Sequence, residues 1–533
     1  MPPSAAQDSS PHCRPSPDGR FIATLRPSEL VVRSTETLQV TNSVRLPSGS
    51  GSGSGSGSPP ASSSAGTSTS LTPLLWAPSS SKVLVCSADQ LDVFGALHHP
   101  EFHATVRHYT SLIGGKPSLI QFGARDTELL IWSASGLKLV IVDVCGSGVI
   151  EIASPKFHQA TSASRGLSVR PETGHLALLA RSGGRDIVSL HNPVDRQVLR
   201  SWHPETLDAQ GLAWTPDGKW LLLWESAVQG HRLLIHTPDG QHFRTITASN
   251  LLKGPDAELE LGIRVCQLSP SAEICAIGDY SRDVCILRTH SWRAQMRLYH
   301  PVNIVPKDTL QVWQEKIAMD SSQARARHTF LKATQVLSPP GPASDPQFAA
   351  EVKPGCSMAA FDASSTLLAT RLDDSPCTLW IWDIVAAELR AVLIFHSPVS
   401  FQWHANLREL LLITSQDPAQ RGVSFIWDPL SEGPTPLVPE DYLPAGRSVR
   451  KTQVAWINRE TEAPVLFVSD AEHYLLLSPS NNAERDTNPW QTAAAADHSG
   501  SEMALDSPTS ACYAMDDGDG ASVVDDTFSF KMP

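Results

Sequence analysis

The sequence lacks the features by which many chains enter or cross a membrane. It opens with Met1-Pro2-Pro3 and a polar stretch rather than the charged and apolar segments of a secretory signal. No uninterrupted apolar run approaches the roughly 20 residues that a transmembrane helix needs. We therefore expect no membrane association.

Cysteine is present as nine scattered residues, and no two of them form a Cys-x-x-Cys pair. Several lie within apolar, strand-like runs, namely Cys86, Cys266, Cys275 and Cys285. In such places a thiol commonly acts as a small buried apolar group. This usage favours a reducing, cytosolic or nuclear compartment.

The common catalytic motifs are also missing. The sequence holds no nucleophile elbow, no His-Glu-x-x-His and no dinucleotide-binding fingerprint. The stretch Gly114-Gly115-Lys116-Pro117 lacks the spacing and the Ser or Thr of a phosphate-binding loop. Asp373-Asp374 follows an apolar run, where a polar turn is the ordinary interpretation. We predict no catalytic residues, no cofactor-binding residues and no enzymatic activity.

Histidine is concentrated in one place without the marks of a metal site. The cluster consists of His98, His99, His103 and His108. Zinc sites usually combine ordered spacing with Cys or carboxylate ligands, whereas Pro100 and a loop-like composition interrupt this cluster. A surface loop is the preferred interpretation, and we predict no metal-binding residues.

Positive charge is in deficit. The chain has 42 Lys and Arg against 55 Asp and Glu, a formal net charge of −13. Residues 484–533 hold ten acidic and two basic residues, and so contribute −8 of that charge. A basic nucleic-acid footprint is missing, and we expect no nucleic-acid partner. The acidic tail, 481–533, is predicted to be disordered.

The clearest positive signal is the alternating stretch Thr378-Leu379-Trp380-Ile381-Trp382-Asp383-Ile384. Its length and alternation fit a strand better than a helix. Two shorter apolar runs precede it, separated by a polar turn at Ala363-Ser364-Ser365. The same order returns at 401–403, 410–413 and 423–428. Two adjacent copies of one unit indicate a repeat protein.

Nine such units can be followed between residues 13 and 480. In eight of them a large apolar residue closes the first strand before a turn: Trp76, Phe122, Val169, Trp214, Leu268, Phe361, Trp403 and Trp456. The turns use suitable residues, as in Thr215-Pro216-Asp217-Gly218, because Pro presets φ and Gly accepts positive φ. Without two interruptions each unit averages about 44 residues, matching the roughly 40–45 of a WD-repeat blade.

We therefore predict an all-β fold, a WD-repeat β-propeller of about nine divergent four-stranded units. Trp-Asp itself occurs only at 382–383 and 427–428, so the hydrogen-bond network of standard WD repeats cannot be assumed. Nine units exceed the usual four to eight blades. Either one unit lies outside the ring or the ring is unusually large.

The domain organisation follows from the repeat. Residues 1–12 are expected to be flexible, because 2–11 are too rich in Pro and Ser to supply an obvious closing strand. Residues 13–480 form the propeller region. A Gly/Ser-rich insertion at 47–70 and a Pro-rich insertion at 301–350 interrupt it.

The Pro-rich insertion contains a candidate strand and a basic cluster. Residues 309–313 could pair as a strand, and the basic cluster at 325–328 is interpreted as a solvated loop. A long inserted loop on a rigid scaffold is a sensible place for partner contacts.

With the units laid out, the chain resembles a fungal member of the centrosomal and spindle-pole-body family often called WD-repeat protein eight. The resemblance covers residues 13 to about 478. It rests on these stretches: Ser16-Pro17-Asp18-Gly19 with Leu30-Val31-Val32-Arg33, the segment 211–218, His300-Pro301, 368–371 with 379–384, 391–393, and Ser397-Pro398-Val399-Ser400-Phe401-Gln402-Trp403. The last groups, in this order and spacing, are more specific than a generic WD motif.

The resemblance implies a non-enzymatic scaffold at the spindle pole body or another microtubule-organising centre, in the cytoplasm and cytoskeleton. Its partner would be a coiled-coil microtubule-anchoring protein, with which it would tether microtubule minus ends and support spindle assembly. Association with microtubules would be indirect. The resemblance carries over no partner-binding residue.

Two alternatives stay open. One is a generic WD-repeat adaptor of another complex, for example a ubiquitin ligase, although the usual Trp-Asp-x-Arg is missing because Ile384-Val385 follow Trp382-Asp383. The other is a propeller hydrolase, whose active site would gather residues from distant blades that sequence alone cannot bring together.

Overall fold

A computed structural model describes residues 1–46, 73–146, 148–248, 261–320, 325–341, 355–407, 409–417, 422–444, 452–458 and 463–479. The expected insertion at 47–70 and the acidic tail at 481–533 lie outside these residues. Regular structure within them is almost entirely β. No helix of the described ranges is long and apolar enough to cross a membrane.

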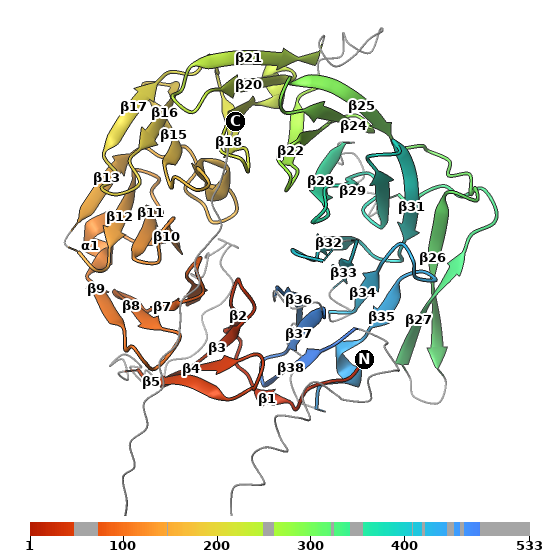
Figure 1. The fold of residues 1–533 in the computed structure, drawn as a ribbon, viewed down its shortest axis with the longest axis horizontal. Helices are drawn as coiled ribbons and strands as arrows, with labels where there is room; N and C mark the ends of the chain where they lie inside the picture. Colours follow the sequence, from red (N-terminus) through yellow and green to blue (C-terminus); the bar gives the residue numbers. More distant parts are fainter. Residues whose placement is uncertain are drawn as a thin grey trace, which may run out of the picture. The chain divides into compact units, whose positions relative to one another are not determined.

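Nine antiparallel blades form a ring (Figure 1). Blades one to three consist of β2 Cys13–Pro15, β3 Phe21–Arg26, β4 Glu29–Ser34 and β5 Val40–Arg45; β6 Leu74–Trp76, β7 Lys82–Cys86, β8 Gln90–Gly95 and β9 His103–Arg107; and β10 Pro117–Phe122, β11 Glu128–Ser133, β12 Lys138–Asp143 and β13 Val149–Ala153. Blades four to six consist of β14 Leu167–Val169, β15 Leu176–Ser182, β16 Arg185–His191 and β17 Val198–Trp202; β18 Ala209–Trp214, β19 Leu221–Glu225, β20 Arg232–His236 and β21 His242–Thr247; and β22 Ile263–Leu268, β23 Ile274–Asp279, β24 Asp283–Arg288 and β25 Arg293–Tyr299.

The last three blades include two departures from the simple pattern. Blade seven contains β28 Cys356–Phe361, β29 Leu367–Leu372, β30 Thr378–Asp383 and β31 Glu388–Ile394, extended by β26 Gln311–Asp320 and β27 Arg325–Lys332. Blade eight contains β32 Val399–Trp403, β33 Leu411–Ser415, β34 Ser424–Trp427 and β35 Thr435–Leu437. Blade nine contains β36 Gln453–Ile457, β37 Val465–Ser469, β38 His473–Leu477 and β1 Gln7–Asp8. The helices are short: α1 Tyr109–Ile113 and 3-10 turns at Ala163–Arg165, Ala227–Gln229 and Pro439–Asp441.

All nine predicted units are therefore blades of a single ring, which resolves the open question of ring size in favour of an unusually large one. In each blade the inner three strands follow one another in sequence order, and an outermost strand completes the sheet. The predicted all-β propeller is confirmed, and nine blades exceed the usual four to eight.

The hydrophobic core is distributed between neighbouring blades rather than gathered at one centre. One apolar cluster joins Leu179 and Val188 of blade four to Trp214 and Leu234 of blade five. Middle strands are covered on both sides by neighbouring blades, and every residue of β11 is buried, whereas outer β13 alternates between exposed and half-buried residues. Each blade thus depends on its neighbours for burial, as in other repeat proteins.

Three of the tryptophans that end first strands, Trp76, Trp403 and Trp456, also connect blades by hydrogen bonds. The Trp76 indole N–H donates to the Arg14 carbonyl oxygen at 2.9 Å. In the same way Trp403 donates to the Ala360 carbonyl at 2.9 Å, and the Trp456 indole donates to the preceding blade at 3.3 Å. The spacing of the repeat predicts each of them as the large apolar residue that ends a first strand. The structure places them at the inner ends of the blade interfaces.

The N-terminus is not the flexible segment that its composition suggested. Gln7 and Asp8 form β1, which pairs antiparallel with Tyr474 and His473 of β38. The N-terminus lies beside the last blade in Figure 1, and β1 supplies the outer strand of that blade. Pro and Ser are tolerated here because an outermost strand needs only one of its two edges paired. The expectation of flexibility for 1–12 is corrected accordingly.

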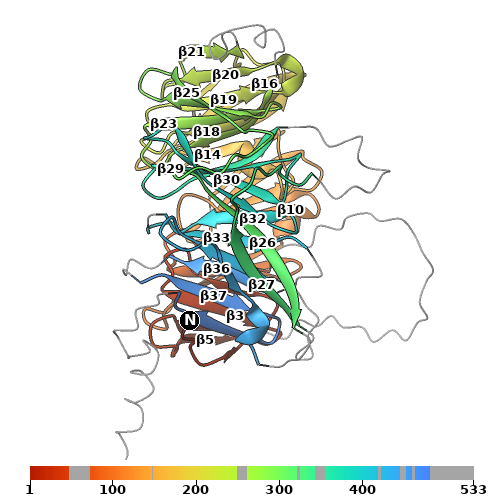
Figure 2. The same cartoon turned by 90° about the vertical axis from the view of Figure 1, so that its right-hand side faces the viewer.

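The Pro-rich insertion is also more ordered than expected, since it contains β26 and β27. The strand anticipated at 309–313 is present in extended form, and the basic cluster at 325–328 lies in β27 rather than in a solvated loop. We call this two-stranded unit the ribbon. Figure 2 shows it running along the side of the ring.

Candidate functional site

The histidine cluster does not converge on one point. His103 Nε2 lies 3.2 Å from Asp92 Oδ1, whereas His108 Nδ1 lies 2.6 Å from the separate carboxylate of Asp89. His98 and His99 contact each other edge to face, with ring centroids 4.5 Å apart. Across the described ranges no group of three or more His, Cys, Asp or Glu is placed to hold a metal ion.

The glycine-rich stretch after α1 ends a helix and starts a strand. Gly114 has a φ of 69° and Gly115 a φ of 152°, a conformation that side chains with a Cβ rarely adopt. Pro117 then begins β10. This geometry explains the glycines as a helix C-cap, a common use of glycine at this position.

Asp373 and Asp374 do follow a strand, but they contact the neighbouring blade. Arg264 Nη2 lies 2.8 Å from Asp373 Oδ2, and Arg282 donates to Asp374. Both arginines belong to or adjoin the strands of blade six. The sequence placed these carboxylates correctly in a turn but gave no sign of their inter-blade partners.

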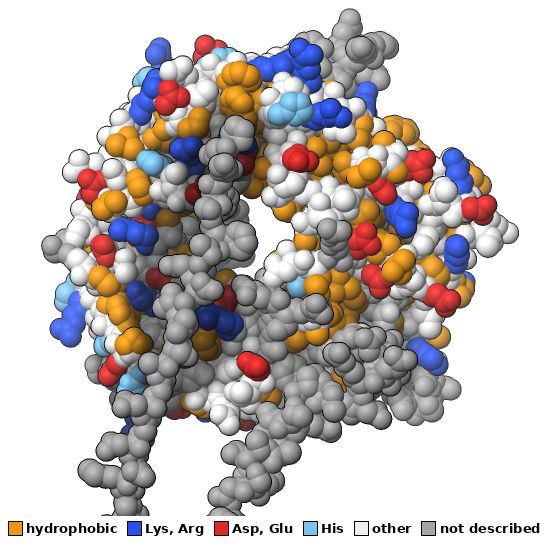
Figure 3. All heavy atoms as spheres, viewed as in Figure 1, with side chains coloured by type: hydrophobic (Ala, Val, Ile, Leu, Met, Phe, Trp, Pro, Cys, Tyr) orange, Lys and Arg blue, Asp and Glu red, His pale blue; other side chains and the backbone are white. Residues whose placement is uncertain are grey.

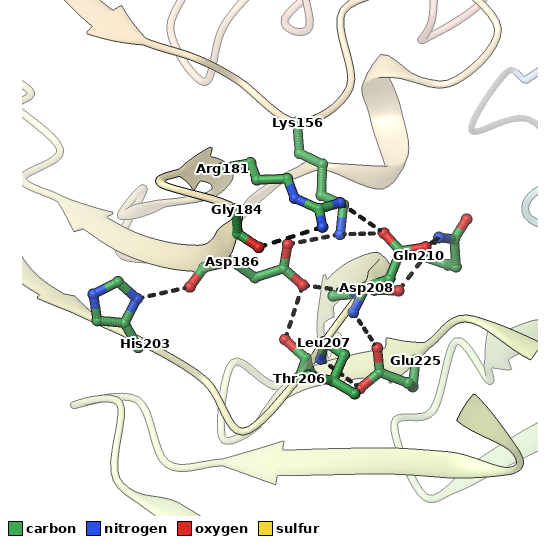
Figure 4. A network of polar contacts seen from close by, with 11 residues as sticks. Lys156, Arg181, Gly184, Asp186, His203, Thr206, Leu207, Asp208, Gln210 and Glu225 are labelled. Carbon is green, nitrogen blue, oxygen red and sulfur yellow. Dashed lines mark hydrogen bonds and ion pairs between the residues drawn. The ribbon is translucent and has the colours of Figure 1, made fainter. Parts of the chain in front are cut away.

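Blades four and five are connected by a larger polar network (Figure 4). Lys156 Nζ lies 2.7 Å from Asp186 Oδ1 and 3.0 Å from Asp208 Oδ1. Asp186 also accepts a hydrogen bond from the Thr206 hydroxyl at 3.0 Å, and Glu225 accepts one from the Asp208 backbone N–H. The buried carboxylates of Asp186 and Glu225 are thus compensated by the Lys156 ammonium group, by the Arg232 guanidinium 3.7 Å from Glu225 Oε2, and by several N–H and O–H donors, as burial of charge requires.

A buried ion pair joins blades three and four. The Arg196 guanidinium donates through Nε to Glu128 Oε1 and through Nη2 to Glu128 Oε2 at 2.8 Å. The Ala124 backbone N–H also donates to Glu128, and Arg196 Nη1 donates to the Gly174 carbonyl at 2.7 Å. A Cβ on Gly123 would lie 2.2 Å from the Glu128 carboxylate, so this close approach requires glycine.

Blade seven contains a hydrogen-bond network that begins in the blade before it. His300, which follows β25, places Nε2 at 2.8 Å from Thr370 Oγ1, and the Trp382 indole N–H donates to the same hydroxyl at 3.1 Å. His300 Nδ1 lies 2.6 Å from the Arg282 carbonyl oxygen. Trp382 is the Trp of the Trp-Asp pair, so this copy of the repeat keeps an internal network although most copies lack its residues.

Burial lowers the pKa of His300 to about 3, from 6.5. Above pH 6.5 the imidazole is neutral in the folded and unfolded chain. As the pH falls below 6.5, the unfolded chain binds a proton that the folded chain excludes, so stability falls until the pH reaches about 3. One such proton changes the free energy of unfolding by about 1.4 kcal/mol per pH unit. Burial also lowers the pKa of His236, to about 4, so this residue likewise makes stability fall as the pH is lowered.

We expect the substitution His300→Gln to reduce this acid sensitivity by one proton. Urea unfolding between pH 7 and pH 4 should give a steeper loss of stability for the unaltered protein than for the variant, with slopes that differ by up to about 1.4 kcal/mol per pH unit. Equal slopes would show that His300 is accessible to protons in the folded chain.

One hollow lies near the inner strands of blades eight, nine and one. Its volume is about 770 Å³, and its lining includes Arg14, Phe401 and Asp470. Cys13 also lines it, and burial raises the pKa of this thiol to about 11. A protonated thiol is a poor nucleophile. Arg14 and Asp470 give the lining one guanidinium and one carboxylate, and this carboxylate accepts hydrogen bonds from the backbone N–H groups of Glu472 and His473.

The ribbon is firmly attached to the ring at its base. β26 pairs in parallel with β31 from Gln311 to Gln314 and antiparallel with β27. Glu315 Oε1 lies 2.5 Å from His328 Nδ1, and Glu315 Oε2 accepts the His396 backbone N–H at 2.8 Å. Phe330 of β27 packs edge to face on Phe425 of blade eight, with centroids 5.4 Å apart. The base therefore bridges blades seven and eight.

One face of the ring mixes charges of both signs around the open centre (Figure 3). Hydrophobic side chains are scattered between them on that face. Such interspersed charge gives no strong field of one sign over the face. The ribbon, which stands out from the rim, is the better candidate for a specific interaction surface.

Comparison with known proteins gives similarity over most of the chain. The mouse protein "WD repeat-containing protein WRAP73" is 26% identical over 438 residues, which are 78% of this chain and 84% of its own. A fission-yeast protein, "Uncharacterized WD repeat-containing protein C32H8.09" of Schizosaccharomyces pombe, is 22% identical over 486 residues, 87% of this chain and 88% of its own. No family model matches the sequence.

A solved structure aligns more loosely. The dihydro-heme d1 dehydrogenase NirN matches 81% of this chain and 77% of its own at 11% identity, with a TM-score of 0.43, which carries no argument about activity. The chain is thus similar along most of its length to two WD repeat-containing proteins, and its fold is a nine-bladed β-propeller.

Proposed function

We propose that this chain is a non-enzymatic scaffold of the spindle pole body or an equivalent microtubule-organising centre. It binds a coiled-coil microtubule-anchoring protein, and through that partner it holds microtubule minus ends and supports spindle assembly. The observation that carries the proposal is the similarity to two WD repeat-containing proteins along most of both chains, WRAP73 among them. The motif resemblance at 378–403 points to the same class.

The fold supports a binding role for physical reasons. Charged pairs between blades, such as Lys156 with Asp208 and Arg264 with Asp373, hold neighbouring blades in fixed relation. A rigid ring presents loops and edges without losing much conformational entropy when a partner binds. Binding sites on loops and edges of a rigid scaffold are common.

The association with microtubules should be indirect, because a chain of net charge −13 is repelled by the acidic microtubule surface. We expect the purified protein to stay in the supernatant when it is centrifuged with microtubules, and to pellet once the coiled-coil partner is added. A fluorescent fusion should mark the spindle pole, and loss of the protein should leave microtubules detached or the spindle misassembled.

Salt-sensitive pelleting without a partner would contradict the indirect arrangement. A diffuse signal throughout mitosis would contradict the location and favour a generic WD-repeat adaptor instead.

A further inference from the structure

The outer half of the ribbon leaves the blade as two strands alone. β26 pairs with β31 only as far as Gln314, whereas it pairs with β27 out to Asp320. Beyond Glu315 the side chains of Lys316, Ile317 and Met319 are exposed. No described strand covers this part of the ribbon.

The two faces of the outer ribbon differ in chemistry. Successive side chains of a strand point to opposite faces, and directly paired residues share a face. Ile317 and Met319 therefore lie on one face, with Met319 71% exposed. Lys316 lies on the other face together with Arg327, because Arg327 pairs with Ala318.

Among the side chains that the structure describes, no acid forms an ion pair with Lys316 or Arg327 on the basic face. Lys316 and Arg327 are exposed, and Glu315, the acid nearest to them among the described side chains of the ribbon, is buried against His328. Between 316 and 331 the sequence holds Lys316, Arg325 and Arg327 against Asp320, a net charge of +2. This local charge opposes that of the chain as a whole, and it fits an acidic partner.

The free edge of β27 offers backbone groups to such a partner. Its pairing with β26 runs from Arg325 to Lys332, and no second strand pairs with it within the described part of the chain. An unpaired edge is a template for an added strand. A helix lying on the ribbon would contact only one of its two faces. An added strand would extend the sheet, so its alternating side chains would extend both faces.

We propose that the edge of β27 binds an extended, acidic segment of a protein partner by strand addition. In that segment carboxylates alternate with apolar side chains, because the basic face of Lys316 and Arg327 would take the carboxylates and the face of Ile317 and Met319 would take the apolar groups. This inference rests on the proposed scaffold function and names the surface and the partner chemistry that the scaffold uses.

The proposal can be tested on the full chain with short fluorescent peptides and anisotropy measurements. A peptide that alternates glutamate and valine should bind, and its lysine-valine counterpart should not. The paired substitution Lys316→Glu with Arg327→Glu should weaken binding by about tenfold or more, since two attractive contacts become repulsive. The matched control replaces Arg200 and Arg293 with glutamate. These residues are exposed on the outer strands β17 and β25, and their substitution should leave binding unchanged.

Amide hydrogen exchange gives a second readout that does not depend on charge. Strand addition should slow exchange of the β27 backbone between Ala326 and Leu331 when the glutamate-valine peptide is present. Binding without this protection, equal loss in the Arg200 and Arg293 control, or tighter binding of an acidic helical peptide would overturn the proposal.

Failure of this inference can be told apart from failure of the proposed function. If the fusion protein marks the spindle pole and the ribbon variant does so equally while the peptide does not bind, the ribbon assignment is wrong and the scaffold role stands. If the peptide binds as expected but the fusion protein never marks the pole, the ribbon assignment stands and the location is wrong.

Discussion

Removing residues 1–10 should destabilise the whole ring, although these residues contain only one strand of two residues. The Ser4 N–H donates to the Leu476 carbonyl at 2.8 Å, and the Leu476 N–H donates to the Ser4 hydroxyl at 2.9 Å. Ser9 and Ser478 add backbone hydrogen bonds between the same two segments. At about 1 kcal/mol for each hydrogen bond, these contacts amount to roughly 4 kcal/mol.

The comparison should use thermal and urea unfolding of the full chain and the truncated chain. A clear fall in the unfolding midpoint is expected after the truncation, because β38 then becomes an unpaired edge. Removing a similar number of residues from the other end, 524–533, is the control and should leave the midpoint unchanged. An unchanged midpoint after removal of residues 1–10 would show that the pairing of β1 with β38, which closes the ring, contributes no stability.

A rearranged chain tests the same contact without deleting it. Ser478 N lies 3.3 Å from the Pro2 carbonyl oxygen, so residues 1–11 can be joined behind Ser478 by a short linker. A permuted chain that begins near Cys13 and ends with the transferred strand should recover the midpoint of the original protein. Recovery would show that β1 acts through its place in blade nine rather than through its position in the sequence.

The substitution Arg196→Ala should cost about 3–5 kcal/mol, because it leaves the buried Glu128 carboxylate without its guanidinium. Both side chains are almost completely buried, with exposed fractions of 2% and 1%. The matched control is Arg200→Ala, which breaks an exposed pair with Asp239 at 4.0 Å and should cost less than about 1 kcal/mol.

A double substitution separates charge from packing at the same site. Combining Arg196→Met with Glu128→Gln removes both charges, keeps similar volumes and leaves an oxygen for the Ala124 N–H. This pair should be more stable than Arg196→Ala alone, since replacing both partners of a buried pair is often nearly neutral. Equal loss in the double variant would mean that the site depends on shape rather than on compensation of charge.

The features that sequence analysis predicted are those with local signals. Strand alternation, turn residues and the aromatic at the end of each first strand repeat along the chain, so the nine blades and the burial of Trp214 and Trp403 could be anticipated. The missed features depend on distant residues. Arg196 and Glu128 are 68 positions apart, and β1 pairs with a strand at the far end of the propeller region.

The ribbon shows an intermediate case. Its start at 309–313 was anticipated from apolar alternation, but β27 was interpreted as a solvated loop because a basic cluster in a Pro-rich segment usually is one. The partner that orders it, Phe425, lies in another blade and leaves no local signal. Candidate surfaces of this kind become visible only when the blades are assembled.

Closure through the first strand has a consequence for synthesis on the ribosome. The N-terminal segment emerges first, but its partner β38 emerges only after Leu477 has been translated. At about 5–20 residues per second, β1 waits roughly 25–95 seconds for that strand. In a chain that terminates before β38, the ring stays open and β1 has no strand to pair with. Such a chain is therefore exposed to proteases and chaperones. The completed ring therefore shows that translation has passed the last strand of the propeller, β38.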